Sequence, residues 1–249
     1  MTDARPVAIV TAASQGIGEA LARGLAARGF RLALMARSSS ILDLANELGG
    51  IGLQGSVTEA ADIDRLVALA EKSFGRIDGV VNNTGRDKES LHVSGAGYDP
   101  DLERELTEIP DESWLYGTEL YLLNVVRMAR AVTPVMRRQG GGSIVNVSTF
   151  GAPEPRLIFP VSGTLRSALA AYQKLYADRY ARDNIRMNSI LPGFVENWPL
   201  SEPVRRTIPM ARSVKMTELV GTTAFLLSAD SGSITGQSLL VDGGVNRGL

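Results

Sequence analysis

A short apolar run that gives way to a loop of small residues, and then to a helical pattern, is the feature that most restricts how this chain can fold. The run at 7–10 consists of Val, Ala and Ile, and apolar residues then recur at Ile17, Leu21 and Leu25, which fall on one face of a helix. A strand that feeds a helix through such a loop brings backbone N–H groups and the positive end of the helix dipole to one place, where a pyrophosphate can bind. The stretch predicts a dinucleotide-binding α/β unit, with an ordinary tight turn as the alternative.

The loop at 11–18 resembles the Thr-Gly-x-x-x-Gly-x-Gly loop of the short-chain dehydrogenase/reductase family. Ala12 stands where that family usually has its first glycine, whereas the other two glycines are present. The resemblance implies that the loop binds a nicotinamide dinucleotide. The residues that it places in contact with this cofactor are Thr11, Ala13, Ser14, Gln15, Gly16, Ile17 and Gly18.

Composition narrows the class of protein. The 249 residues are 44% hydrophobic and 21% charged, which fits one α/β domain over 1–249 with a substantial core. Lys plus Arg (26) nearly balance Asp plus Glu (27), which argues against a nucleic-acid partner. Without cysteine, and with His92 as its only histidine, the sequence offers no thiolate chemistry and argues against a metal site or a Ser-His triad. With no apolar run long enough to span a bilayer and no secretory signal at 1–6, we expect a cytoplasmic protein without a membrane partner.

The end of the second predicted strand bears on the choice of cofactor. In dinucleotide folds an acidic residue after this strand binds the ribose 2′-hydroxyl, whereas an Arg accommodates a 2′-phosphate. The strand at 31–36 ends at Ala36, which by the resemblance occupies the acidic position, and Arg37 follows it. The pair favours NADP(H) over NAD(H), with a simply solvated Arg37 as the alternative.

Three further segments resemble the family in the same order along the chain. Ser56 and Val57 follow a strand at 51–54 and are implied near the adenine, with Ser56 in place of the usual Asp. The family's Asn-Asn-Ala-Gly appears as residues 82–85, in which both Asn amides can tie neighbouring strand ends together. A Pro-Gly turn ends the sixth predicted strand on the nicotinamide side. These two segments add Asn83, Gly85, Pro192 and Gly193 to the implied cofactor contacts.

The catalytic positions of the family fall on residues that this chain has changed. Its Tyr-x-x-x-Lys pair shares one helix face, so that the ammonium lowers the phenol pKa from about 10. Alignment puts Phe159 and Gly163 at these two positions, Tyr121 at the catalytic Asn and Ser148 at the substrate-binding serine. Phe has no proton to give and Gly has no charge, and Arg166 could supply the lost cation. General acid assistance is worth roughly 10²–10⁴ in rate, so we expect ordinary carbonyl reduction to be impaired.

Three functions remain open from the sequence. The first is an NADP(H)-dependent oxidoreductase acting on a small molecule, with Tyr121 as a relocated proton donor, Ser148 polarising the oxygen and Arg166 as the cation. The second is a nucleotide-binding sensor or an inactive partner subunit, and the third is non-redox chemistry such as isomerisation or dehydration. The intact cofactor loops and the Pro-Gly turn favour the first two.

The resemblance covers nearly the whole chain and implies a Rossmann-like, doubly wound parallel sheet of about seven strands with helices on both faces. A long polar insertion is expected at 86–110 and a substrate loop at 194–212. Two long predicted helices, at 113–138 and 163–182, carry apolar residues on more than one face. One face can cover the sheet while the other needs a partner, which predicts a homodimer or homotetramer.

Overall fold

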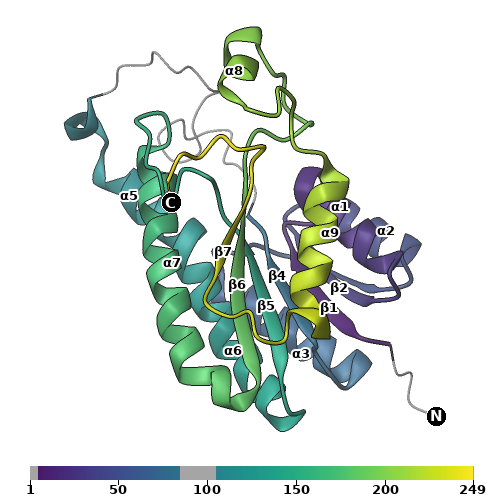
Figure 1. Ribbon diagram of the computed structural model, residues 1–249. Coiled ribbons are helices and arrows are strands. Elements are labelled where there is room, and N and C mark those ends of the chain that lie inside the picture. Colours follow the sequence, from purple (N-terminus) through teal and green to yellow (C-terminus); the bar gives the residue numbers. More distant parts are fainter. Residues whose placement is uncertain (1–4, 85–104, 249) are drawn as a thin grey trace.

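One parallel sheet of seven strands forms the centre of the computed structural model, which describes residues 5–84 and 105–248 (Figure 1). The spatial order is β3-β2-β1-β4-β5-β6-β7, so the chain reverses direction across the sheet between β1 and β4. Ligands of such sheets bind beyond the carboxyl ends of the strands at this reversal. The strands are β1 Val7–Thr11, β2 Arg31–Ala36, β3 Ile51–Gln54, β4 Gly79–Asn82, β5 Gly142–Val147, β6 Ile185–Pro192 and β7 Ser238–Val241.

Helices cover both faces of the sheet, as the sequence predicts (Figure 1). One layer consists of α1 Gly16–Ala26, α2 Ser40–Glu47 and α9 Met216–Leu227. The other consists of α3 Ala60–Phe74, α6 Asn124–Arg138 and α7 Pro160–Tyr180. Successive strand residues face opposite layers: Ala8 and Val10 of β1 join the first core, and Ile9 joins the second. Burial on both faces explains why the central strands read as nearly continuous apolar runs.

The helix expected at 113–138 is interrupted. It consists of α5 Asp111–Thr118, a π-helical turn at Glu119–Leu123 and then α6. Such wide turns are rare and occur frequently at functional sites. The turn buries Leu120 and Tyr121, and Glu119 is ion-paired with Arg127 of α6. The periodicity of the sequence did not reveal this break.

Two other boundaries differ from the prediction. Helix α7 begins at Pro160, and a 3₁₀ turn at Ala181–Asp183 follows its last residue. The substrate loop is partly regular, because it contains α8 Glu202–Thr207 and a bridge between Val195 and Val214. Most of the insertion predicted at 86–110, including His92, lies outside the described residues. Among the residues that are described, none belongs to a helix long and apolar enough to cross a bilayer.

Candidate functional site

The glycine-containing loop after β1 is tied to the end of β4 by three hydrogen bonds. The Thr11 hydroxyl donates to the Asn83 carbonyl (2.8 Å) and accepts from the Asn83 N–H (3.1 Å), and the Asn83 side-chain amide donates to the Ala12 carbonyl (3.2 Å). A Cβ at Gly18 would lie 2.2 Å from that same carbonyl oxygen, so only glycine fits there. Ala12 has φ +48°, in the left-handed region that favours glycine. The family's glycine at this position therefore has a conformational reason, and the Ala12 backbone is strained.

The first turn of α1 opens toward this loop. Gln15 is the residue before the helix, and the helix begins at Gly16 with φ +58°. The first N–H groups of a helix lack intrahelical acceptors, so they remain available to a phosphate. Ala13 differs from its neighbours, since its N–H donates to the Met35 carbonyl (3.2 Å) and is not available.

The segment after β6 reaches over the same loop. A Cβ built at Gly16 would lie 3.4 Å from the side-chain amide nitrogen of Asn197. Asn197 therefore lies beside the place where the loop and α1 meet, and its amide could donate to a phosphate. Asn197 is not among the residues predicted from the sequence, although its position shortly after the Pro-Gly turn was an available signal.

The Pro-Gly turn itself is fixed by two neighbouring elements. Gly193 donates its N–H to the Val241 carbonyl of β7 (3.0 Å), and the Pro192 carbonyl accepts from Phe150 (3.2 Å). A Cβ at Gly193 would lie 2.7 Å from the Cα of Asp242, so a larger residue would force β7 away.

At the β2–β3 end of the site, Arg37 is exposed directly after β2, and its carbonyl accepts from the Gln54 side chain (2.9 Å). Ser56 donates its N–H to Asp62 (2.8 Å), and its hydroxyl is hydrogen-bonded to the Thr58 hydroxyl (2.8 Å) and N–H (3.2 Å). The Ser56 hydroxyl is thus engaged in a local turn, and Val57 beside it is half-buried.

The two Asn side chains join strand ends as expected. Asn82 donates to the Asn146 side chain (2.9 Å), which links β4 to β5, and Asn83 links β4 to the loop after β1. Gly85, the last residue of the motif, lies outside the described residues. The pair holds the carboxyl edge of β1, β4 and β5 together.

Arg166 of α7 also contacts the carboxyl edge of the sheet. Its guanidinium donates to the Val147 carbonyl at the end of β5 and to the Thr84 hydroxyl (3.1 Å), and its Cζ lies 4.6 Å from the centroid of the Tyr121 ring. Within the described residues no carboxylate forms an ion pair with it. Burial lowers the pKa of Arg166, and Tyr121 opposes that shift. The contacts bring together a strand end, the Asn-Asn motif and the π-helical turn.

The other predicted hydroxyl follows β5 directly. Ser148 donates its N–H to the Ile190 carbonyl (2.9 Å), which continues the β5–β6 pairing by one residue. Its neighbour Thr149 also carries a hydroxyl, which accepts from the Gly151 N–H (3.3 Å). Both residues are one or two positions beyond the Val147 carbonyl that Arg166 binds.

Phe159 and Gly163 lie in different surroundings. The Phe159 ring meets the Phe150 ring edge-on, with 6.3 Å between centroids, and packs against a small core that includes Ile208. A Cβ at Gly163 would lie 3.1 Å from the Gly151 carbonyl oxygen. The alignment predicts this pair beside the reacting oxygen; in the structure Phe159 packs in the small apolar core, and Gly163 lies against the segment after β5.

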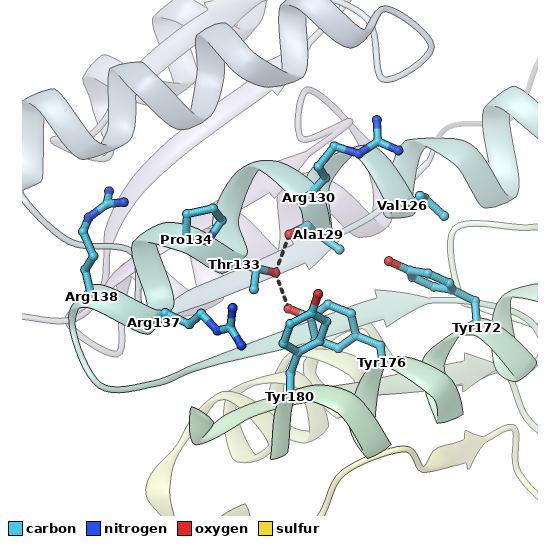
Figure 2. A pocket seen from close by; sticks show the side chains of 10 residues that line it. All are labelled: Val126, Ala129, Arg130, Thr133, Pro134, Arg137, Arg138, Tyr172, Tyr176 and Tyr180. Carbon is cyan, nitrogen blue, oxygen red and sulfur yellow. Dashed lines mark hydrogen bonds between the residues drawn. The ribbon is translucent and has the colours of Figure 1, made fainter. Parts of the chain in front are cut away.

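A cavity of about 630 Å³ lies elsewhere, between the outer faces of α6 and α7 (Figure 2). Three tyrosines and three arginines surround it, and the Tyr176 hydroxyl is hydrogen-bonded to the Thr133 hydroxyl (2.6 Å). Burial raises the pKa of Tyr176 to about 12. The cavity shares no residue with the cofactor loops. Its lining residues are Val126, Ala129, Arg130, Thr133, Pro134, Arg137, Arg138, Tyr172, Tyr176 and Tyr180.

The chain matches one known protein family over most of its length. The family model described as enoyl-(acyl carrier protein) reductase matches residues 11–246, nearly the entire chain. The chain belongs to the short-chain dehydrogenase/reductase family. With it the chain joins a class of NAD(P)-dependent oxidoreductases, as the glycine-containing loop and the strand order indicate.

Individual relatives match this chain over nearly the whole length of both proteins. A 3-oxoacyl-[acyl-carrier-protein] reductase from Synechocystis sp. is 31% identical over 252 residues, covering 96% of both chains. The structure of L-sorbose reductase from Gluconobacter frateurii, complexed with NADPH and L-sorbose, has a TM-score of 0.88 at 28% identity, covering 100% of this chain and 99% of the other. A 3-ketoacyl-(acyl-carrier-protein) reductase from Brucella melitensis, complexed with NADH, has a TM-score of 0.84 at 26% identity, with 97% and 98% covered. The two structures hold different cofactors, so similarity alone does not choose between them.

Proposed function

We propose that this member of the short-chain dehydrogenase/reductase family is an NADP(H)-dependent enzyme that interconverts a carbonyl group and an alcohol on a small molecule. The observation that carries the proposal is the set of contacts made by Arg166. Its guanidinium joins the end of β5, Thr84 and the buried ring of Tyr121. A cation held by neutral groups at the carboxyl edge of the sheet is suited to stabilise negative charge on a reacting oxygen.

The residues around the first loop fit a dinucleotide. The Cβ that Gly18 lacks would fill the space against the Ala12 carbonyl, and the N–H groups of residues 16–18 lie in the first turn of α1, where intrahelical acceptors are lacking. We expect the pyrophosphate there, beside Asn197, and a 2′-phosphate at Arg37. The remaining contacts expected with the cofactor are those of Thr11, Ser14, Gln15, Ile17, Ser56, Val57, Asn83, Gly85, Pro192 and Gly193.

Different side chains of the protein would carry out different parts of the reaction. The bound cofactor would supply the hydride for reduction or accept it for oxidation. Ser148 would polarise the carbonyl oxygen, and Arg166 would stabilise the charge that develops on it. A hydroxyl near Arg166 must give the proton, and Tyr121 is the phenol that the alignment favours for this role.

Turnover of activated ketones with NADPH tests the proposal directly. We expect wild type to consume NADPH, and Arg166→Met to lower kcat/KM about 10²–10³-fold, the usual effect of removing a group that stabilises the oxyanion. Arg166→Lys keeps a charge and should recover part of the rate. Equal rates in wild type and Arg166→Met would contradict the assignment of Arg166.

A second function is favoured by the changes at Phe159 and Gly163, which remove the proton donor and the charge from their aligned positions. The chain would then bind NADP(H) as a sensor or as an inactive partner subunit. Binding of NADPH with no turnover on any ketone or alcohol would support this alternative. Turnover without a change in NADPH absorbance would instead indicate isomerisation or dehydration.

We also propose that the chain assembles as a homodimer or homotetramer through the outer faces of α6 and α7. The cavity of Figure 2 lies between these two helices, and Leu175 on α7 is 68% exposed, so the outer face of α7 offers apolar surface for a partner to cover. Light scattering should give a multiple of the chain mass, and Leu175→Glu should reduce it. A single-chain mass for wild type at micromolar concentration would refute the assembly.

A further inference from the structure

We infer that Ser162 is the catalytic proton donor, acting as the hydroxyl partner of Arg166 on helix α7. This inference rests on the proposed carbonyl–alcohol chemistry and deepens it by naming the acid. It assigns to Ser162 and Arg166 the positions that the alignment gives to Phe159 and Gly163.

Helix α7 presents two different rows of residues to the site. Gly163 and Ser167, four residues apart, both meet the segment after β5: a Cβ at Gly163 would touch the Gly151 carbonyl, and the Ser167 hydroxyl donates to the Ala152 carbonyl (2.5 Å). Arg166 instead reaches the end of β5 and Thr84. Residues four apart share a helix face, so Ser162 lies on the face of Arg166, one turn closer to the beginning of the helix.

The Ser162 hydroxyl is available for a ligand in a way that its neighbours on α7 are not. Thr164 and Ser167 both donate to the carbonyl four residues earlier, Pro160 (2.7 Å) and Gly163 (2.9 Å) respectively. Within the described residues the Ser162 hydroxyl forms no such hydrogen bond. Ser162 is 7% exposed, and its hydroxyl is not one of the buried polar atoms without a partner among the described residues. A nearly buried serine thus keeps its hydroxyl accessible.

The electrostatic setting also favours charge at this oxygen. Ser162 is in the first turn of α7, a helix of 21 residues, where the positive end of the helix dipole stabilises negative charge. The guanidinium of Arg166 adds a full positive charge one turn away. Tyr121, whose ring lies against Arg166, acts as a positioning residue for that cation and not as the acid.

The reaction balances without a further reagent. As the hydride from the reduced cofactor adds to the carbonyl carbon, the π electron pair moves to oxygen, and Ser162 gives its proton to that oxygen. Ser162 then takes a proton from water. The carbonyl compound is reduced to an alcohol, and the nicotinamide cofactor is oxidised.

Two serine-to-alanine variants on the same helix provide the first test. We expect Ser162→Ala to lower kcat at least about 100-fold, at the lower end of general acid effects, with an unchanged Kd for NADPH. Ser167→Ala, on the row that faces Gly151, is the matched control and should change kcat less than threefold. A Ser162→Ala variant that folds and keeps wild-type kcat would overturn the inference.

The pH profile separates Ser162 from Tyr121 as the donor. Among the described residues, Tyr121 is the titratable side chain in contact with Arg166. A phenol donor loses its proton on the basic side, so reduction would slow as the pH rises. A serine donor predicts a rate that stays level from about pH 7 to 10. A basic limb that disappears in Tyr121→Phe would assign the proton to Tyr121 and overturn the role of Ser162.

Two double variants test the helix face even where wild type has no turnover. Ser162→Tyr with Arg166→Lys places the family's acid and cation on the face that meets β5, and Phe159→Tyr with Gly163→Lys places them on the other row. We expect NADPH-dependent ketone reduction from the first pair only, with folding of both checked by thermal unfolding and NADPH titration. Activity in the second pair alone, or in neither when both fold and bind NADPH, would overturn the inference. Inactive wild type with an active first pair would reject both the proposed function and the role of Ser162 as donor, and would support only the assignment of the helix face.

Discussion

The guanidinium carbon of Arg166 lies 4.6 Å from the centroid of the Tyr121 ring, which couples helix α7 to the π-helical turn before α6. A contact of this kind is worth about 0.5–2 kcal/mol, depending on how far it is desolvated. Tyr121 is buried, so the cation is held between an aromatic face and the end of β5. The position of the Arg166 guanidinium therefore depends on Tyr121, a side chain of the π-helical turn.

Replacing Tyr121 should separate its ring from its hydroxyl. Tyr121→Ala removes a buried aromatic side chain and is expected to lower the free energy of unfolding by about 3–5 kcal/mol, with a fall in kcat as Arg166 loses its support. Tyr121→Phe keeps the ring and should retain most of the kcat. Urea unfolding and steady-state kinetics measure both effects. If Tyr121→Phe and Tyr121→Asn lost turnover equally, the hydroxyl and not the ring would be the functional part.

Arg37→Ala should change the preference between the two nicotinamide cofactors. A hydrogen bond between charged groups contributes about 1.5–3 kcal/mol, so we expect NADPH to bind about 10–100-fold more weakly while NADH binding stays nearly constant. Titration of each cofactor by intrinsic fluorescence provides the comparison. Equal losses for both, or tighter binding of NADH to wild type, would refute the preference for NADP(H).

Two single substitutions in the loop after β1 are expected to have contrasting effects on cofactor binding. Ala12→Gly removes a strained left-handed residue at the cost of greater freedom in the unfolded chain, so we expect stability to rise by at most about 1 kcal/mol with cofactor binding kept. Gly18→Ala puts a Cβ 2.2 Å from the Ala12 carbonyl oxygen and should abolish NADPH binding. Thermal unfolding and NADPH titration of the two variants test this contrast. Normal NADPH affinity in Gly18→Ala would mean that the loop moves freely.

Tyr176 should make stability depend on alkaline pH. Its pKa is raised by burial to about 12, above the ordinary value of about 10, so the folded state holds the phenol proton more tightly than the unfolded state. This contribution is complete below pH 10 and is lost as the pH rises from about 10 to 12, by up to about 1.4 kcal/mol per pH unit.

Tyr176→Phe has no ionisable hydroxyl, so it is the matched control for this pH dependence. The stability difference between wild type and Tyr176→Phe should therefore shrink between about pH 10 and 12, as measured by urea unfolding at a series of pH values. A difference that stays constant over this range would show that Tyr176 ionises equally in both states.

Most of the fold could be predicted from the sequence, because strand and helix periods repeat over many residues. Strand β2 occupies the predicted residues 31–36, and the helix predicted at 41–48 is α2, Ser40–Glu47. Helix α8 was missed because six residues are too few to form a helix without tertiary contacts, and Val204 is buried in the fold. The π-helical turn was missed because one extra residue hardly changes the apolar pattern.

The candidate site was predicted in part. The hydrogen bonds of Asn82 and Asn83 to neighbouring strand ends followed from the motif, whereas the catalytic roles given to Arg166 and Tyr121 stay predictions. The register of α7 could not be read in the same way. Phe159 and Gly163 are four residues apart, as are Ser162 and Arg166, and spacing alone does not tell which pair faces the strand ends.

The π-helical turn at Glu119–Leu123 also limits how this chain can change. A π turn holds about one residue more than an α turn, so its removal would need only a single-residue deletion. Because the two kinds of turn cover nearly the same angle, such a deletion would leave α5 and α6 close to their present orientation and would rearrange only the residues inside the turn. Tyr121 lies inside the turn, so the ring beneath Arg166 is the part that such a deletion would displace. A single residue in this turn therefore separates two different surroundings for the same cation, with the sheet and the flanking helices unchanged.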